Sequence, residues 1–95
     1  MRSDKAVMHI RRIQWDLDAW EEYCLWQRTD RTVLKRINLL IREIQRSPFD
    51  GIGKAEPLKG NLSGFWSRRI NEEHRIVYAV EDDSVVIISC RGHYK

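Results

Sequence analysis

The clearest hydrophobic pattern in the chain lies between residues 30 and 46. Apolar side chains recur there at the spacing of one helix face, in the series Val33, Leu34, Ile37, Leu40, Ile41 and Ile44. Ser47 and Pro48 follow, and proline disfavours helical geometry in the residue before it. This segment is therefore predicted to form an amphipathic helix that ends before Pro48.

Two weaker patterns precede this helix. Residues 10–15, IRRIQW, place isoleucine and tryptophan between polar residues, which is typical of a short strand. Residues 17–27 carry apolar side chains at helical spacing, with Asp16 in the N-cap position and acidic residues in the first turns. A short strand and a first helix are therefore predicted before the stronger helix.

The second half of the chain has loop character followed by strand character. Residues 50–64 contain four of the five glycines and predict a long irregular connection. Strand-like runs follow at residues 65–70, 74–80 and 84–90, separated by polar triplets. We therefore expect the α+β class: a short strand, two helices and an antiparallel sheet, with the second helix packing its apolar face on the sheet.

Composition narrows the class of protein further. A chain of 95 residues allows one domain, and 42% apolar with 33% charged residues is typical of a globular protein. No apolar run reaches the roughly 18 residues that a membrane helix needs, and the N-terminus lacks the apolar stretch of a secretory signal. We expect a cytoplasmic protein with no membrane partner.

The cysteines and histidines do not have the spacing of metal ligands. Cys24 and Cys90 are far apart and predict buried, reduced thiols. His9, His74 and His93 show no HxxxH or HxH spacing. Neither a metal nor another cofactor is predicted.

The net charge of +3 comes from the first half of the chain, mainly from residues 28–46. At about 100° per residue, five basic side chains fall within about one sixth of a turn, opposite the apolar stripe. These are Arg28, Arg31, Lys35, Arg42 and Arg46. This basic ridge has two interpretations: an ordinary solvated helix face, or a surface that follows the phosphates of a polyanion.

A second group of cations is predicted in the sheet. If residues 71–73 form the first hairpin loop, Arg69 lies directly opposite Arg75 on the neighbouring strand. Like charges in such positions are destabilising, so the pair indicates an anionic ligand. An internal carboxylate such as Glu56 could also neutralise it.

The sequence also contains several groups suited to metal-free phosphodiester cleavage. The irregular connection contributes Glu56 and Lys59, and the chain end contributes His93 and Tyr94. Such cleavage needs a base for the ribose 2′-OH, an acid for the departing 5′-oxygen, and cations that stabilise charge on phosphorus. Taken singly, these residues also fit a surface carboxylate, a terminal histidine and an aromatic ring that packs on the sheet.

Longer motifs point to a family. Residues 48–94 contain EPLKGNLSGFWSRRI, EEHRIVY and a closing HY, and the preceding WEEYCLWQRTDRTVLKRINLLIREIQRSPF continues the same pattern. From about Ile10 to Tyr94 the chain closely resembles the YoeB/Txe toxins, a branch of the RelE superfamily of bacterial type II toxin-antitoxin systems. The resemblance implies a microbial RNase (RelE-like) fold for a toxin domain at residues 10–95, preceded by an N-terminal extension at residues 1–9.

The resemblance also implies an activity and partners. It implies an endoribonuclease that cuts mRNA in the ribosomal A site and leaves 2′,3′-cyclic phosphate and 5′-OH ends. It implies inhibition by a cognate YefM-like antitoxin, contact with DNA only through that antitoxin, and pairing as a homodimer in some members. A non-catalytic rival with the same fold would use the basic ridge to occupy ribosomal RNA and block translation without cutting.

Matching the motif positions assigns roles to individual residues. The general base falls on Glu56, the phosphate-stabilising arginine on Arg75, and the general acid on His93. Supporting roles fall on Lys59, Arg69 and Tyr94.

Overall fold

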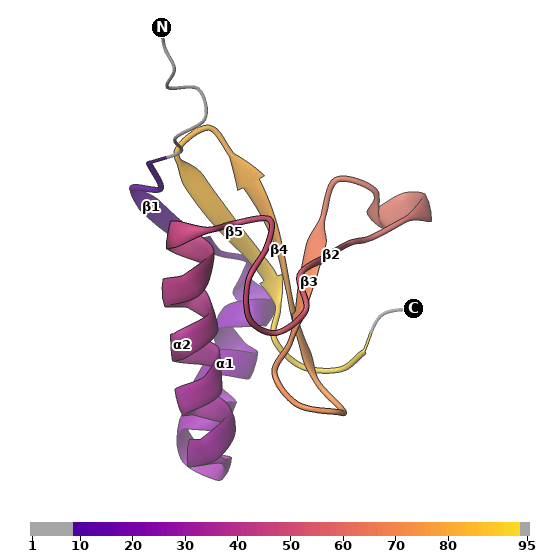
Figure 1. Ribbon diagram of the computed structural model, residues 1–95. Helices are drawn as coiled ribbons and strands as arrows, with labels where there is room; N and C mark the ends of the chain where they lie inside the picture. The colour runs from indigo at the N-terminus through magenta and orange to yellow at the C-terminus, as the bar shows by residue number, and fades with distance from the viewer. Residues whose placement is uncertain (1–8, 94–95) are drawn as a thin grey trace, which may run out of the picture.

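The computed structural model describes residues 9–93, so residues 1–8 of the predicted extension, and Tyr94 with Lys95, lie outside it. Within this range the elements are β1 (Arg12–Trp15), α1 (Leu17–Thr29), α2 (Arg31–Arg46), β2 (Glu56–Pro57), the short 3-10 helix η2 (Gly60–Leu62), β3 (Trp66–Arg69), β4 (Arg75–Glu81) and β5 (Ser84–Ser89). Both helices lie on the same side of the sheet (Figure 1). The predicted α+β class is confirmed.

The strands form one sheet in the order β1-β5-β4-β3-β2. The three predicted strands of the second half are present, and β3, β4 and β5 form the predicted antiparallel meander. The first strand, β1, pairs parallel with β5 at the edge, so the sheet is mixed and not purely antiparallel. A parallel pair needs a long connection between its strands, and the chain between β1 and β5 contains both helices and the strands β2, β3 and β4.

Helix α2 packs on the sheet as its pattern predicted. Its buried residues are Val33, Ile37, Leu40 and Ile44. They belong to one apolar cluster with residues of β4 and β5, including Tyr78 and Ile87. Burial of apolar surface is the dominant favourable term in folding, and this stripe contributes to it.

Asp30 separates the two helices. Its backbone is extended (φ −155°, ψ 98°), and its carboxylate accepts hydrogen bonds from the backbone N–H groups of Thr32 and Val33. This is an N-cap, which satisfies donors that a helix start leaves free. Arg28 therefore lies in α1, and its assignment to the basic ridge of α2 was wrong, because the helical count does not continue through an extended residue.

The connection after α2 is more ordered than its composition predicted. Its residues Glu56 and Pro57 form strand β2 and pair with Ser67 and Trp66. The backbone N–H of Arg69 donates to the carbonyl of Gly53 at 2.6 Å. Gly53 has φ +84°, and a Cβ there would lie 2.9 Å from Cδ2 of Leu40, so this close approach requires glycine.

A buried arginine holds this connection in place. Arg68 has no exposed surface, and its guanidinium donates to the carbonyls of Ser47, Asp50 and Ile52 and to the Tyr78 hydroxyl. The Tyr78 hydroxyl in turn donates to the Pro48 carbonyl at 2.6 Å, and burial raises the pKa of this phenol. The buried guanidinium thus finds its acceptors in the carbonyls of this connection and in the Tyr78 hydroxyl, and holds the connection against the sheet.

Two further sequence predictions have outcomes in the structure. Both cysteines are free thiols, and Cys90 is buried as predicted, whereas Cys24 is only half-buried. Neither helix of the described chain has the length and apolar character to cross a membrane.

Candidate active site

The predicted opposition of Arg69 and Arg75 is confirmed. The two residues are direct partners in the antiparallel ladder of β3 and β4. Ile76 and Tyr78 belong to the core on the helix side. Because side chains alternate along a strand, Arg75 and its partner Arg69 lie on the face of the sheet turned away from the helices.

The charges of these two arginines are available to a ligand. The Arg75 guanidinium donates to the carbonyls of Asn71 at 2.8 Å and His74 at 3.1 Å, which holds it against the hairpin loop without neutralising it. None of the ion pairs among residues 9–93 involves Arg69 or Arg75. An anion bound here would relieve the repulsion between the two like charges.

Glu56 lies on the same sheet face. It pairs with Ser67 of β3, which is two residues before Arg69, and residues two apart on a strand share a face. Its side chain is 55% exposed, and its carboxylate lies 3.9 Å from the Lys54 ammonium. The short strand β2 therefore brings a solvent-accessible carboxylate to the face that carries the arginine pair.

The chain end runs beside β4 after a β-bulge in β5. The ladder passes from Ile87 opposite Tyr78 to Ser89 opposite Val77, which leaves Ile88 as an extra residue in β5. Beyond β5, the backbone N–H of Arg75 donates to the carbonyl of Gly92 at 2.9 Å. His93 is exposed and follows directly, so the structure places it next to the start of β4.

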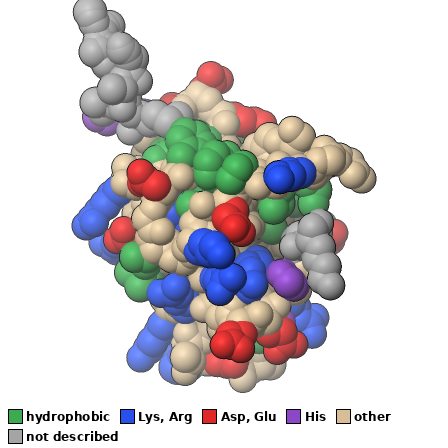
Figure 2. All heavy atoms as spheres, turned by 45° about the vertical axis from the view of Figure 1, so that its right-hand side comes forward, with side chains coloured by type: hydrophobic (Ala, Val, Ile, Leu, Met, Phe, Trp, Pro, Cys, Tyr) green, Lys and Arg blue, Asp and Glu red, His purple; other side chains and the backbone are tan. Residues whose placement is uncertain are grey.

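Of the two predicted supporting residues Lys59 and Tyr94, the structure describes only Lys59. Lys59 is exposed and directly precedes the short helix η2, in the connection from β2 to β3. Tyr94 lies outside the described residues. Figure 2 shows lysine and arginine side chains gathered on one face of the molecule, with acidic and histidine side chains beside them.

The basic ridge of α2 lies on the other side of the molecule. Its remaining members are all exposed, and they are Arg31, Lys35, Arg42 and Arg46. They face away from the buried stripe of α2, which packs toward the sheet, whereas the arginine pair faces away from the helices. The ridge and the candidate site are therefore two separate cationic surfaces.

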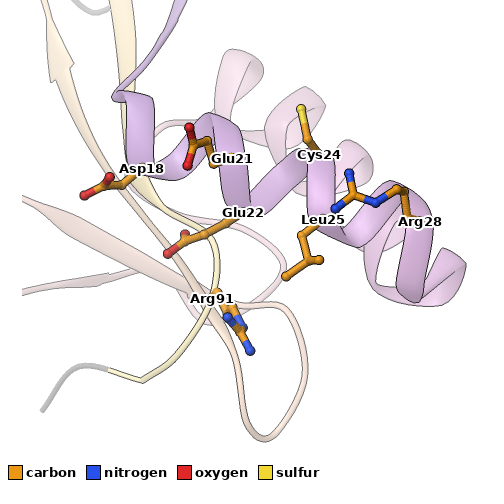
Figure 3. Close-up of a pocket in the computed structure, with 7 residues that line it drawn as sticks. All are labelled: Asp18, Glu21, Glu22, Cys24, Leu25, Arg28 and Arg91. Atoms are coloured by element: carbon orange, nitrogen blue, oxygen red, sulfur yellow. The ribbon is translucent and has the colours of Figure 1, made fainter.

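A hollow of about 580 Å³ lies between α1 and the segment after β5, away from the arginine pair. Figure 3 shows its lining, which consists of Asp18, Glu21, Glu22, Cys24, Leu25, Arg28 and Arg91. Arg28, placed on the ridge by the sequence pattern, lines this hollow instead. The carboxylates of α1 and the two arginines make its surface mixed in charge.

The buried Cys90 thiol is poorly suited to metal binding or nucleophilic attack. Burial, together with the charge of Glu22, raises the pKa of the Cys90 thiol to about 12. The thiol is therefore protonated at neutral pH, and the thiolate is the form that binds metals and attacks substrates. Within residues 9–93, no group of three His, Cys, Asp or Glu side chains is arranged to hold a metal ion.

Sequence reasoning missed the structural arginine, Arg68. A signal was present, because the alternation of the strand at residues 65–70 places Arg68 on the same face as Trp66 and Ile70. An arginine on the core side of a strand needs several buried acceptors, and the loop after α2 provides them.

Comparison with known proteins identifies the family. Residues 15–94 match the model of the YoeB-like toxin of bacterial type II toxin-antitoxin systems. The chain belongs to this family. It is 58% identical to Toxin YoeB of Escherichia coli K12 over 83 residues, which are 87% of this chain and 99% of that protein. It is therefore the toxin of a type II toxin-antitoxin system.

Solved structures of other YoeB toxins share the fold. A YoeB dimer from Staphylococcus aureus superposes with a TM-score of 0.84 at 45% identity, covering 90% of this chain and 99% of that one. A YoeB-YefM complex from the same organism has a TM-score of 0.82 at 44% identity, covering 90% and 98% of the two chains. The predicted RelE-type toxin fold is confirmed.

Proposed function

We propose that this YoeB-family toxin is a ribosome-dependent endoribonuclease that cuts mRNA in the A site. Glu56 takes the proton from the ribose 2′-OH, whose oxygen attacks the adjacent phosphorus. His93 protonates the departing 5′-oxygen, so the products are a 2′,3′-cyclic phosphate and a 5′-OH end. The nucleophile is part of the substrate, and the reaction therefore needs no metal-activated water.

The cations have a defined task in this mechanism. Negative charge builds up on the phosphorus oxygens in the five-coordinate transition state, and Arg75 and Arg69 stabilise it. Arg75 is held by the hairpin carbonyls, so little reorganisation is needed when the charge develops. Lys59 and Tyr94 are assigned supporting contacts to the phosphate and the reacting groups.

One observation carries the proposal. Arg69 and Arg75 oppose each other without a carboxylate partner among the described residues, on the sheet face that also bears Glu56. The segment that ends in His93 is hydrogen-bonded to the backbone of Arg75. The shared face of Glu56 and the arginine pair, with the chain end bonded to β4, supports a site that combines base, acid and cations.

Primer extension on mRNA that is being translated tests the activity. Discrete cuts inside codons are expected after induction, and Glu56→Gln or His93→Gln should slow cleavage by about 10²-fold or more, because each removes a proton-transfer group. Glu81→Gln is the matched control, since Glu81 is an exposed carboxylate at the far end of β4. Growth inhibition without any cuts would favour the non-catalytic translation blocker.

We propose that the basic ridge docks on the ribosome, whether the toxin cleaves mRNA or only blocks translation. Lys35→Glu with Arg42→Glu should weaken ribosome association and lower the slope of log K against log salt by about 2, because about two phosphate contacts are lost. Arg11→Glu with Arg12→Glu changes the net charge equally on exposed residues outside α2. Equal co-sedimentation of both double variants across a salt series would identify the ridge as an ordinary solvated face.

Membership of the YoeB family also suggests the partners of this toxin. We propose that a YefM-like antitoxin neutralises this toxin, that contact with DNA occurs only through the antitoxin, and that the toxin pairs as a homodimer. The candidate site supports the first of these, because an acidic antitoxin segment would be attracted to the Arg69 and Arg75 pair.

A further inference from the structure

The segment that follows β5 carries His93 but is not part of the sheet. Chain ends are commonly mobile unless other elements hold them. Three side chains from other elements hold this one: Glu22 and Trp26 of α1, and His74 at the end of the hairpin loop between β3 and β4. We refer to these three residues as the tail clamp.

The two α1 residues hold Cys90. The Cys90 backbone N–H donates to Oε1 of Glu22 at 2.8 Å, and its carbonyl accepts from the Trp26 indole N–H at 3.0 Å. The Cys90 thiol donates to the Ala19 carbonyl at 3.7 Å, and its raised pKa keeps the proton on sulfur. In Figure 3, Glu22 extends from α1 toward the segment that carries Arg91.

His74 holds Gly92, the residue before His93. The Gly92 backbone N–H donates to Nδ1 of His74 at 2.9 Å, and the Gly92 carbonyl accepts from the Arg75 backbone N–H at 2.9 Å. The edge of the Trp26 ring packs against the His74 ring, with the ring centroids 4.9 Å apart at 67°. Both polar backbone atoms of Gly92 are therefore held.

The hydrogen bond to Gly92 determines the form of the imidazole. Nδ1 accepts a hydrogen bond from the amide N–H, so Nδ1 carries the lone pair and the ring proton lies on Nε2. Nε2 lies 3.7 Å from the Glu73 carboxylate, and only 13% of the His74 side chain is exposed. His74 has no direct place in the proposed proton transfers, which leaves this contact without an assigned role.

We propose that His74 is a positioning residue, which fixes the His93 imidazole at the phosphodiester by holding the Gly92 amide. The inference rests on the proposed function of His93 as the general acid. An acid must lie within about 3 Å of the oxygen that it protonates, and a displacement of about 1 Å can cost about 10²-fold in rate. A residue one peptide bond from His93 is well placed to control that distance.

Two substitutions of His74 separate positioning from general packing. His74→Leu removes the acceptor and should lower the single-turnover cleavage rate by about tenfold or more, with ribosome affinity unchanged. His74→Asn retains an acceptor, because Oδ1 of asparagine is at the same distance along the side chain as Nδ1 of histidine. Its rate should return to within about threefold of the wild-type rate.

An amide measurement tests the clamp independently of activity. The Gly92 amide should be protected from hydrogen exchange in the wild type and in His74→Asn, and should lose about tenfold or more of its protection in His74→Leu. Equal protection in all three proteins would overturn the proposal, as would equal cleavage rates. A wild-type toxin that cleaves nothing while the amide responds as expected would instead refute the proposed function.

Trp26→Phe provides a second route if His74→Leu does not fold. It removes the indole N–H that Cys90 needs but leaves an aromatic ring beside His74. We expect cleavage to slow by about threefold or more with ribosome affinity unchanged, because the chain end loses one of its anchors. An unchanged rate in folded Trp26→Phe, together with unchanged Gly92 protection, would overturn the clamp.

Discussion

Replacing the ribose 2′-OH by hydrogen at the cut position is expected to abolish cleavage. In the proposed mechanism, this hydroxyl is the nucleophile, and Glu56 can activate it only by removing its proton. A deoxynucleotide offers no such group, since the 2′-OH is what distinguishes RNA from DNA. The measurement uses ribosomes assembled on synthetic mRNA that carries a single 2′-deoxy residue in the A-site codon, with the products separated on a gel.

The matched control moves the same substitution by one codon. A 2′-deoxy residue outside the A site should leave the cleavage rate unchanged, because ribosome binding and decoding remain intact. Undiminished cleavage at the deoxy position itself would rule out attack by the 2′-OH and would require water as the nucleophile. The test thus separates this mechanism from direct hydrolysis without altering the protein.

Arg68→Met is expected to destabilise the fold by about 3 kcal/mol or more. Methionine keeps most of the apolar stem but removes every donor, which leaves the carbonyls of Ser47, Asp50 and Ile52 without their bonds to Arg68. A hydrogen bond to a charged group contributes about 1.5–3 kcal/mol, and Arg68 makes four such bonds. Urea unfolding with a fixed m-value measures the change.

Arg69→Met is the matched control on the same strand. Arg69 is exposed on the opposite face, and substitutions at such positions usually change stability by less than about 0.5 kcal/mol. The two variants should therefore affect different properties. Arg68→Met lowers the stability of the fold, whereas Arg69→Met leaves stability unchanged and lowers the cleavage rate. Equal stability of the two proteins would show that the Arg68 network contributes little.

The local pattern of the chain was sufficient to predict its most regular elements. The spacing from Val33 to Ile44 determined α2 and its buried face, because a single helix can satisfy that period by itself. The register that opposes Arg69 to Arg75 followed from the length of the hairpin loop, since a short loop leaves only a few pairings. The motifs around Glu56, Arg75 and His93 were sufficient to indicate the family.

Other features depended on partners that are distant in the sequence. Strand β2 forms because β3 offers a pairing edge, even though glycine and proline around Glu56 favour a loop. Likewise, β1 pairs with β5, a strand from the opposite end of the described chain. Arg28 does not belong to the basic ridge of α2, because the extended backbone of Asp30 separates the two helices. A helical count of 100° per residue from Arg28 to Arg46 assumes one continuous helix and does not reveal this break.

The sequence by itself thus determined the class of fold, the strongest helix and the chemical groups of the candidate site. Only the tertiary structure decided how the segments that carry those groups are arranged. It placed Glu56 on the sheet face of the arginine pair through β2 and held the segment before His93 with Glu22, Trp26 and His74. Periodicity reports contacts between neighbours in the sequence, whereas these contacts join residues up to 68 positions apart, where only the folded chain specifies the partner.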